Sequence, residues 1–440
     1  MNNLNNLFVK AKNSLAFKKI AANSAWILLE KGIRLIVGLL VGAWVARYLG
    51  PALFGELAYV LAFLAFFQVI SVLGMDGIIV RDISKRREEA PSLLGTALTL
   101  RITSGFICWL LAIFLMGLIN GWDDHSVKIT ALAGGTLLFQ AGDTVDLWFQ
   151  SQSQSKRTVL MKLIAVSISN GLKVIFIINE APLSFFALVV SIEAMISAVC
   201  LAFAYKRFRC ESSWMLDTKL IERLLKESWP FILSGLSIII YMRIDQIMIG
   251  EILGNAELGI YAAAITLSFM WSVIPMSLSV SFAPILSKKK AQSEYDYRIT
   301  LSRIFRLFSL LGWLVCIPIY FFADELVRVL YGVDYESAAF VLKIFIFTNI
   351  FINMGVAQSL WILNEGKSKI SFYKTLFGAL VCVTLNYFLI PVYGIIGAAI
   401  SAVLSQFSST VLINFFICRD IFLLQCKSLI LLDCRDYYEK

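Results

Sequence analysis

The sequence predicts an all-α polytopic membrane protein, with about 12 transmembrane helices in two six-helix bundles and both termini in the cytoplasm. Three observations lead to this fold class. Hydrophobic residues make up 59% of the 440 residues, above the roughly 45–50% of a soluble domain. They fall in runs of about 20 to 28 residues, each long enough to cross a bilayer as a helix. Lysine and arginine gather at alternate ends of these runs.

The apolar runs divide into two sets of six. The first six lie at 24–47, 55–76, 93–119, 127–149, 159–179 and 183–204. The second six lie at 229–250, 257–286, 301–322, 337–363, 370–390 and 394–417. The sequence therefore predicts an N-terminal bundle at 1–204, a cytoplasmic linker at 205–228, a C-terminal bundle at 229–417 and a cytoplasmic tail at 418–440.

The distribution of basic residues supports this partition, because arginine and lysine accumulate in short cytoplasmic loops. Thirty of the 39 basic residues lie in the segments on the side of the N-terminus. The loops on the other side hold only Arg47, Lys128 and Arg328. An odd number of spans would destroy this alternation, so the pattern predicts an even number with both ends inside.

The two halves share a short motif between their first and second spans. Residues 49–58 and 253–262 match at Leu, Gly, Ala, Gly and Ala with a constant offset of 204. Both copies lie on the same, non-cytoplasmic side. Because each half has an even number of spans, the halves form a parallel repeat about an axis along the membrane normal, an organisation typical of transporters.

Metal, nucleotide and nucleic-acid chemistry lack their usual residues. The chain has a single histidine, His125, and its eight cysteines show no C-x-x-C pair, so neither a metal nor another cofactor is predicted. Gly366-Lys367-Ser368 resembles the end of a P-loop, but Trp361 stands where its first glycine is required. The net charge of +9 follows from the topology, so no nucleic-acid partner is expected.

About eleven ionisable side chains lie inside the apolar runs. Each costs on the order of 3 kcal/mol near the bilayer centre by insertion scales, so their number predicts a packed or water-filled polar interior. The cations are Lys31, Arg34, Arg101, Lys173, Arg243 and Lys343, and the acids are Glu30, Asp143, Asp146, Glu193 and Asp245.

The spacing of these groups leaves two kinds of role open. Glu30 and Arg34 are spaced i, i+4, so they can neutralise each other on one face of the first span. Arg34 also lies ten residues from Ser24, hence about 15 Å deep and close to the membrane midplane. An arginine there binds phosphate oxygens well, because its planar fork is bidentate and stays charged.

For the acids of the fourth span, 127–149, and the charges of the seventh span, 229–250, sequence spacing alone does not identify the role. Asp143 and Asp146 share a helix face, and two close carboxylates raise one another's proton affinity. A proton site and plain solvation at the helix end both stay open. Arg243 and Asp245 are two residues apart and point in different directions, so each needs a partner elsewhere.

Several motifs occur in an order that is similar to one known family. They are Glu30-Lys31-Gly32, Tyr48-Leu49-Gly50-Pro51-Ala52-Leu53-Phe54-Gly55, Trp148-Phe149-Gln150, Asp245-Gln246-Ile247-Met248-Ile249-Gly250, Gly259-Ile260-Tyr261-Ala262-Ala263-Ala264, Leu330-Tyr331-Gly332 and Pro391-Val392-Tyr393-Gly394-Ile395-Ile396-Gly397-Ala398-Ala399. With these motifs the chain resembles, over nearly its whole length, the Wzx-type O-antigen and polysaccharide flippases of the multidrug/oligosaccharidyl-lipid/polysaccharide (MOP) exporter superfamily.

The resemblance implies two six-helix bundles around a central cavity in the inner membrane of a bacterium. Alternating access, coupled to an ion, would carry an undecaprenyl-pyrophosphate-linked oligosaccharide between leaflets, in contact with membrane lipids and with a polysaccharide polymerase and chain-length machinery as partners. The expected substrate contacts are Arg34, Lys31, Arg101, Lys173, Arg243 and Lys343. The expected ion-coupling residues are Asp143, Asp146, Asp245 and Glu193. Six cations against five acids do not by themselves predict a strongly cationic cavity.

Two alternatives stand beside this interpretation. A drug or small-molecule antiporter of the same superfamily would require acids rather than arginines facing the cavity. A membrane polysaccharide polymerase or glycosyltransferase would require a large loop outside the membrane, and the longest such loop, 323–336, is short. The sugar composition, the class of surface polysaccharide, the coupling ion and the oligomeric state are not encoded in any motif found.

Overall fold

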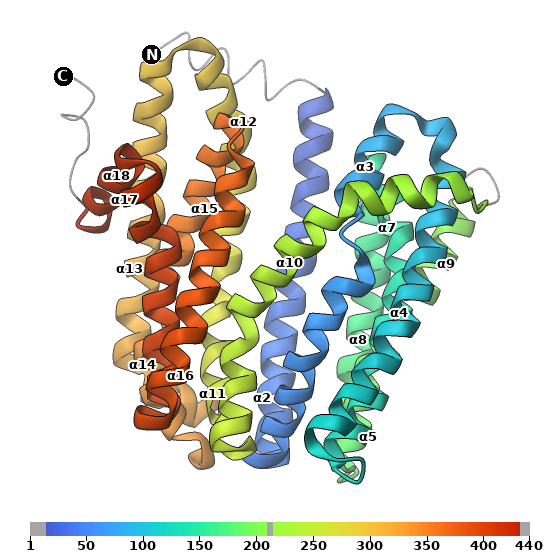
Figure 1. The fold of residues 1–440 in the computed structure, drawn as a ribbon, viewed down its shortest axis with the longest axis vertical. Helices are drawn as coiled ribbons and strands as arrows, with labels where there is room; N and C mark the ends of the chain where they lie inside the picture. Colours follow the sequence, from blue (N-terminus) through green and yellow to red (C-terminus); the bar gives the residue numbers. More distant parts are fainter. Residues whose placement is uncertain (1–14, 209–213, 432–440) are drawn as a thin grey trace. The chain divides into compact units, whose positions relative to one another are not determined.

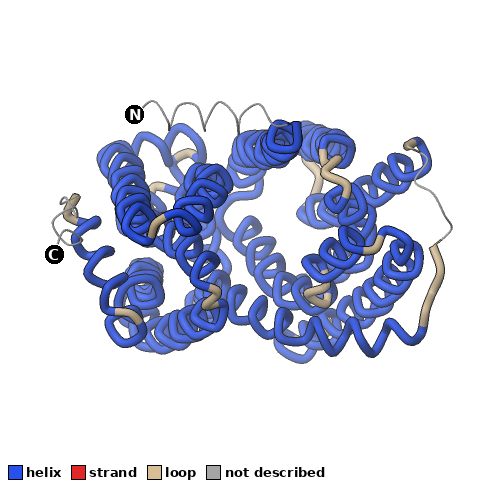
Figure 2. The backbone as a smooth tube through the Cα atoms, turned by 90° about the horizontal axis from the view of Figure 1, so that it is seen from above, coloured by secondary structure: helices blue, strands red, loops and turns tan. Residues whose placement is uncertain are grey.

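The computed structural model describes residues 15–208 and 214–431, and all regular secondary structure in these ranges is helical (Figures 1 and 2). The chain divides into two compact units. Unit 1 comprises Met1–Gly38 and Phe67–Leu233, and unit 2 comprises Leu39–Phe66 and Ser234–Lys440. The predicted N-terminal segment before residue 15 and the end of the predicted tail lie outside the described residues. Residues 39–66, assigned from the sequence to the first bundle, pack within unit 2.

Unit 1 contains the two outer parts of α2 and the first part of α10, together with the helices between them. The bounds are α2 (Leu15–Val72), α3 (Asp76–Lys85), η1 (Arg87–Glu89), α4 (Ala90–Asn120), α5 (His125–Gly134), α6 (Thr136–Phe139), η2 (Gln140–Asp143), α7 (Thr144–Ser151), α8 (Lys156–Ile178), α9 (Leu183–Arg207) and α10 (Thr218–Leu253). Residues 218–228 of the predicted linker are thus the helical start of α10.

Ion pairs and a small apolar core hold α3 against the beginning of α10 within unit 1. Ile79 and Ile83 of α3 are buried with Leu224 of α10. Asp82 accepts from both Arg81 and Arg223. The sequence did not predict α3, because its ten residues are too few to cross a membrane.

The predicted span at 127–149 is a broken helix rather than a continuous one. It is divided into α5, α6, η2 and α7, and the break follows the pair Gly134 and Gly135. The Ser191 hydroxyl of α9 donates to the carbonyls of Leu132, at 2.5 Å, and Ala133, at 3.0 Å. A side chain that hydrogen-bonds to these carbonyls interrupts the backbone hydrogen bonds of the helix. No periodicity in residues 127–149 predicts this break.

Unit 2 contains the remainder of α2 and α10 and the C-terminal helices. These are α11 (Asn255–Phe269), η3 (Met270–Ser272), α12 (Val273–Gln292), α13 (Glu294–Tyr331), η4 (Val333–Tyr335), α14 (Ser337–Phe345), α15 (Thr348–Glu365), α16 (Ser368–Phe407), a π-helical turn (Ser408–Leu412), α17 (Ile413–Ile417) and α18 (Arg419–Leu429). A buried core joins α13, α15 and α18 and includes Phe305, Phe308 and Leu424.

Nine helical segments among the described residues are long and apolar enough to cross a membrane. Two of these, Leu29–Lys85 and Lys369–Ile417, are 57 and 49 residues long, far more than one crossing needs. Each contains a glycine with non-helical backbone, Gly50 (φ 73°) and Gly394 (φ 59°). The all-helical polytopic fold class is confirmed, whereas the count of twelve and the cytoplasmic termini stay predictions.

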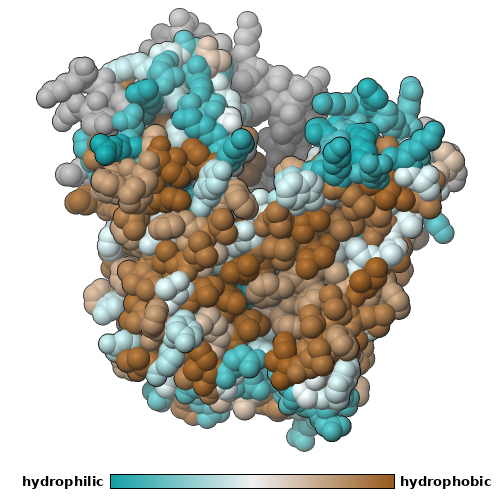
Figure 3. All heavy atoms as spheres, viewed as in Figure 1, coloured by the Kyte–Doolittle hydropathy of each residue, from teal (hydrophilic) through white to brown (hydrophobic). Residues whose placement is uncertain are grey.

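Hydrophobic side chains cover the middle part of the helices in each unit on the face shown in Figure 3, and hydrophilic ones gather near the helix ends. Large apolar side chains are accordingly exposed in both units: Leu110 is 51% exposed, Leu314 is 65% and Phe321 is 69%. In water such surfaces would drive association. Apolar surfaces of this extent are typical of helices that are surrounded by lipid.

The two copies of the repeated motif meet each other inside unit 2. Gly50 and Gly254 share one backbone conformation, with φ and ψ of 73° and 170° in the first and 92° and 174° in the second. A Cβ atom on Gly55 would lie 1.7 Å from the Asn255 carbonyl oxygen, and one on Gly259 would lie 2.0 Å from that of Pro51. The contact is reciprocal, as expected for a two-fold repeat.

The predicted topology can be tested with single cysteines in a variant without the eight native ones. Asp123, between α4 and α5, and Gln292, at the end of α12, are both exposed. We expect Asp123→Cys to react with a membrane-impermeant maleimide in intact cells and Gln292→Cys to react only after permeabilisation, because the basic residues place Gln292 inside. Labelling of Gln292→Cys in intact cells would contradict the predicted orientation.

Candidate functional site

Arg34 of α2 lies in a charged cluster of unit 1. Its Nε donates to Glu30 Oε1 at 3.1 Å, and its Nη1 donates to Glu193 Oε1 of α9 at 3.1 Å. Ser169 of α8 donates to the other Glu193 oxygen at 2.7 Å. The pairing of Glu30 with Arg34 is present as its spacing indicated. Despite two ion pairs, the Arg34 side chain is 45% exposed, so the guanidinium is accessible to a ligand.

Two lysines belong to the same part of unit 1. Lys31 is exposed one turn before Arg34. Lys173, on α8, is half-buried and lies within electrostatic range of Glu193 and Arg34. Five residues on α2, α8 and α9 therefore bring three cations and two acids together. The sequence named these residues but could not show that they form one cluster.

Asp143 and Asp146 share a lysine that the sequence analysis did not single out. Lys162 Nζ of α8 lies 3.0 Å from Asp143 Oδ1 and 2.7 Å from Asp146 Oδ2. The Gln150 amide also donates to Asp146. Asp143 is half exposed and Asp146 is largely buried. We refer to Asp143, Asp146 and Lys162 as the aspartate–lysine triad, and its formal charge is −1 when both carboxylates are ionised.

Arg101 of α4 occupies a separate position in unit 1. Its side chain is only 3% exposed. Nη2 pairs with Asp76 at the start of α3, and Nη1 donates to Thr144 at 3.4 Å. The guanidinium therefore joins three helices, and a substrate would have to displace Asp76 to reach it.

The candidates in unit 2 are also distributed. Arg243 Nη1 donates to Gln246 Oε1 at 3.3 Å. Asp245 is buried and accepts from the Tyr261 hydroxyl and, at 2.8 Å, from the Gln246 backbone amide. Lys343 of α14 pairs with Asp324 of α13 at 2.6 Å. Arg243 and Asp245 thus share Gln246 and lie within electrostatic range of each other, whereas Lys343 pairs separately.

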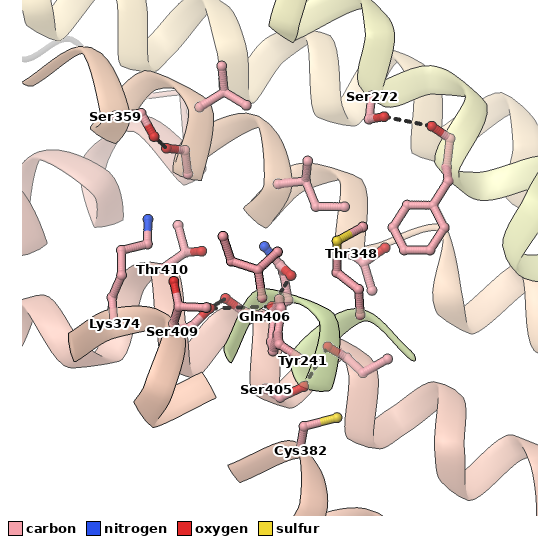
Figure 4. Close-up of a pocket in the computed structure, with 18 of the residues that line it drawn as sticks. Tyr241, Ser272, Thr348, Ser359, Lys374, Cys382, Ser405, Gln406, Ser409 and Thr410 are labelled. Carbon is pink, nitrogen blue, oxygen red and sulfur yellow. Dashed lines mark hydrogen bonds between the residues drawn. The ribbon is translucent and has the colours of Figure 1, made fainter. Parts of the chain in front are cut away.

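Unit 2 contains a cavity of about 330 Å³ between α10, α12, α14, α15 and α16. Figure 4 shows its polar lining, with Tyr241, Lys374, Gln406 and Thr410 around the space. Asp245 also lines it. Phe269, Met276 and Phe345 supply an apolar wall. Lys374 was counted in the sequence with the basic residues of a cytoplasmic loop, so this site was missed.

Metal ligands are not assembled anywhere in residues 15–208 and 214–431. No group of three or more His, Cys, Asp or Glu side chains there could hold a metal ion. The polar groups found are cations, carboxylates, amides and hydroxyls inside helical spans. These are suited to binding polar or ionic groups at membrane depth.

The fold and these charges define a multi-pass membrane protein whose apolar spans hold ionisable groups. The chain belongs to the family described as "Polysaccharide biosynthesis protein", whose model matches residues 20–290. A second model, described as MatE, matches residues 230–388. One relative and two solved structures with this fold are themselves named as transporters or flippases.

Known proteins agree with this assignment. A Shigella flexneri protein named "Putative O-antigen transporter" is 23% identical over 414 residues, which cover 87% of this chain and 94% of that one. The Staphylococcus aureus capsular polysaccharide biosynthesis protein CapF is 25% identical over 175 residues, or 39% of this chain and 44% of CapF.

Solved structures share the fold at low sequence identity. The lipid II flippase MurJ, in an inward closed conformation, has a TM-score of 0.74 and 14% identity, covering 93% of this chain and 91% of its own. An inward-facing multidrug resistance MATE transporter of the MOP superfamily has a TM-score of 0.68 and 16% identity, covering 92% and 96%.

Proposed function

We propose that the protein is a flippase of a bacterial inner membrane that moves an undecaprenyl-pyrophosphate-linked oligosaccharide from the cytoplasmic to the outer leaflet. The oligosaccharide is the repeat unit of O-antigen or of another surface polysaccharide. Support comes from the polysaccharide family match, from the relative named as an O-antigen transporter and from the flippase fold. Twelve spans with cytoplasmic ends complete the proposal, with a polymerase and chain-length machinery as partners.

The observation that carries this proposal is the accessible guanidinium of Arg34 inside an apolar span. Pyrophosphate is the part of the substrate that hydrocarbon opposes most strongly, since ions are costly in a low dielectric. An arginine binds two phosphate oxygens in parallel. Lys31 and Lys173 add positive charge beside it. Arg101, Arg243 and Lys343 would serve as later contacts only after leaving their present partners.

Glu193 offers a way to couple an ion to substrate binding. In the structure it shares Arg34 with Glu30, at 3.1 Å each, so an anionic substrate competes with both carboxylates. A proton taken up by Glu193 removes one competitor and leaves the guanidinium free for phosphate. Asp245, buried in unit 2, is the second such candidate.

The aspartate–lysine triad is the third candidate for ion coupling. One proton shared by its two carboxylates would cancel the net charge of −1. We expect Asp143→Asn, which leaves a single carboxylate paired with Lys162, to keep normal membrane abundance but lose the pH dependence of transport. The measurement is flux against pH in inverted vesicles, with protein quantified by immunoblot.

The control for this experiment is Lys162→Met, which leaves two carboxylates without their cation. It should lower abundance, because one unpaired buried charge costs about 3 kcal/mol or more. If Asp143→Asn retains the full pH dependence, the triad is only a polar helix end.

The flippase proposal is tested by deleting the gene in its host. Surface polysaccharide should disappear, while the lipid-linked repeat unit accumulates at its original length in the cytoplasmic leaflet. Complementation should restore both. An unchanged surface polysaccharide, together with new sensitivity to cationic drugs, would instead favour the antiporter alternative, to which the MatE match at residues 230–388 points.

A further inference from the structure

Lys374 of α16 has no acidic partner within residues 15–208 and 214–431, whereas two other lysines of unit 2 have one. Lys343 pairs with Asp324 at 2.6 Å, and Lys290 pairs with Glu365 at 2.6 Å. Within the described residues, Lys374 makes one hydrogen bond, in which its Nζ donates to Gln358 Oε1 at 3.0 Å. A neutral acceptor uses one of the three ammonium protons and cancels none of the charge.

Gln358 is fixed in this orientation by a buried chain of amides. Its Nε2 donates to Asn414 Oδ1 at 2.8 Å, and the Asn414 amide donates to Gln425 Oε1 at 2.8 Å. Gln425 in turn donates to the Thr410 carbonyl at 3.0 Å. All three amide side chains are fully buried, so a rotation of any one would leave a polar atom unpaired. These linked amides therefore place a neutral hydrogen-bond acceptor, and not a second charge, beside Lys374.

The linked amides end at the π-helical turn, Ser408–Leu412, which borders the cavity. Turns of this kind are rare and are frequently found at functional sites. This turn places Ser409 and Thr410 on the cavity wall. Tyr241 donates to Gln406 Oε1, which leaves the Gln406 amide nitrogen as a further donor at the wall (Figure 4).

Open space adjoins the ammonium. A Cβ atom on Gly355 of α15 would lie 3.5 Å from Thr410 Oγ1 and 3.8 Å from Lys374 Nζ. The hydroxyl, the ammonium and the free side of Gly355 therefore meet at one point. The cavity volume of about 330 Å³ falls in the lower part of the range of ligand pockets.

We propose that this cavity of unit 2 binds a small monovalent anion, a carboxylate or a halide, at Lys374 and Thr410 beside Gly355. The anion supplies the counter-charge that Lys374 lacks, since an ammonium held between helices without one is unfavourable. A carboxylate on an acidic sugar and a free halide share this chemistry. The site concerns binding alone and stands whether or not the chain is a flippase.

The test uses the full-length protein purified in lipid nanodiscs at low ionic strength. Sodium glucuronate, sodium chloride and uncharged glucose are titrated separately by calorimetry. We expect saturable binding of glucuronate or chloride and none of glucose. Glucuronate alone would assign the site to an acidic sugar, and chloride would assign it to an inorganic anion. Binding of neither anion would overturn the proposal.

Four variants locate the anion. Lys374→Met should weaken binding at least about tenfold, the value of one charge-assisted contact, and Lys374→Arg should retain most of it. The methyl group of Gly355→Ala fits without a clash but occupies the space proposed for the anion, so this variant should also weaken binding. It keeps the proposal testable if Lys374→Met does not fold. Lys369→Met, exposed on the same helix, should bind as the unmodified protein does. Unchanged affinity in Gly355→Ala and Lys374→Met would overturn the assignment.

Discussion

Alanine at position 55 should prevent the assembly of unit 2. The Cβ atom would lie 1.7 Å from the Asn255 carbonyl oxygen and 2.7 Å from the Gly259 amide nitrogen, and both of these are backbone atoms that no rotamer change can move. The second part of α2 and α11 would have to separate. Because overpacking costs about 1–3 kcal/mol where side chains can yield, and more where they cannot, we expect at least about 3 kcal/mol of destabilisation. Membrane abundance and the melting temperature in detergent measure it.

Gly42 provides a matched control on the same helix and in the same unit. A Cβ atom there meets nothing within 4 Å, so Gly42→Ala should leave abundance and melting temperature within error of the unmodified protein. Gly259→Ala should reproduce the defect of Gly55→Ala, since its Cβ would lie 2.0 Å from the Pro51 carbonyl oxygen. A normal melting temperature in Gly55→Ala would show that the two motif copies do not pack as described.

The second large effect is expected at Arg34. Arg34 is one of three cations beside two acids, so Arg34→Ala leaves Lys31 and Lys173 to balance the charges of Glu30 and Glu193. Arg34→Ala should therefore reach normal abundance. Transport should fall at least about a hundredfold, because two charge-assisted hydrogen bonds to phosphate are lost. Arg34→Lys should recover part of it, as a point charge replaces the fork.

The alternative role for Arg34 is structural and gives a different pattern. Glu30→Gln and Glu193→Gln would then lower abundance as much as Arg34→Ala, and a variant combining Arg34→Met with both changes would recover it. Arg86→Ala serves as a control for loss of an ion-paired arginine, since Arg86 pairs with Glu89 at 2.8 Å on the surface. Surface polysaccharide and immunoblots of the membrane fraction distinguish the two patterns. Recovery by the combined variant would end the assignment of Arg34 to phosphate.

The helical fold could be predicted because each span is a local property of the chain. Apolar length and the placement of arginine and lysine identify the spans. The Glu30 and Arg34 pair could also be predicted, because i, i+4 spacing determines which side chains meet. Glu193 could not be identified as the second partner, since 159 residues separate it from Arg34 and no periodicity connects them.

Lys162 and Lys374 were not predicted as site residues, for a different reason. Both lie near the ends of their helices, where basic residues normally serve as cytoplasmic anchors, and both were counted as such. Their actual partners, two aspartates in one case and a glutamine in the other, come from other helices. The grouping of residues 39–66 with unit 2 likewise depends on the glycine contact between motif copies, which the matching letters do not reveal.

The central proposal is that this protein moves a lipid-linked oligosaccharide without altering it. The most direct measurement uses the purified protein in liposomes that carry a fluorescent undecaprenyl-pyrophosphate oligosaccharide in both leaflets, with dithionite added outside. The account predicts that dithionite bleaches nearly all the fluorescence with the unmodified protein and about half of it with Arg34→Ala, and that the recovered lipid keeps its original chain length. Bleaching that stops at the outer leaflet with the unmodified protein, or recovery of elongated product, would contradict the claim.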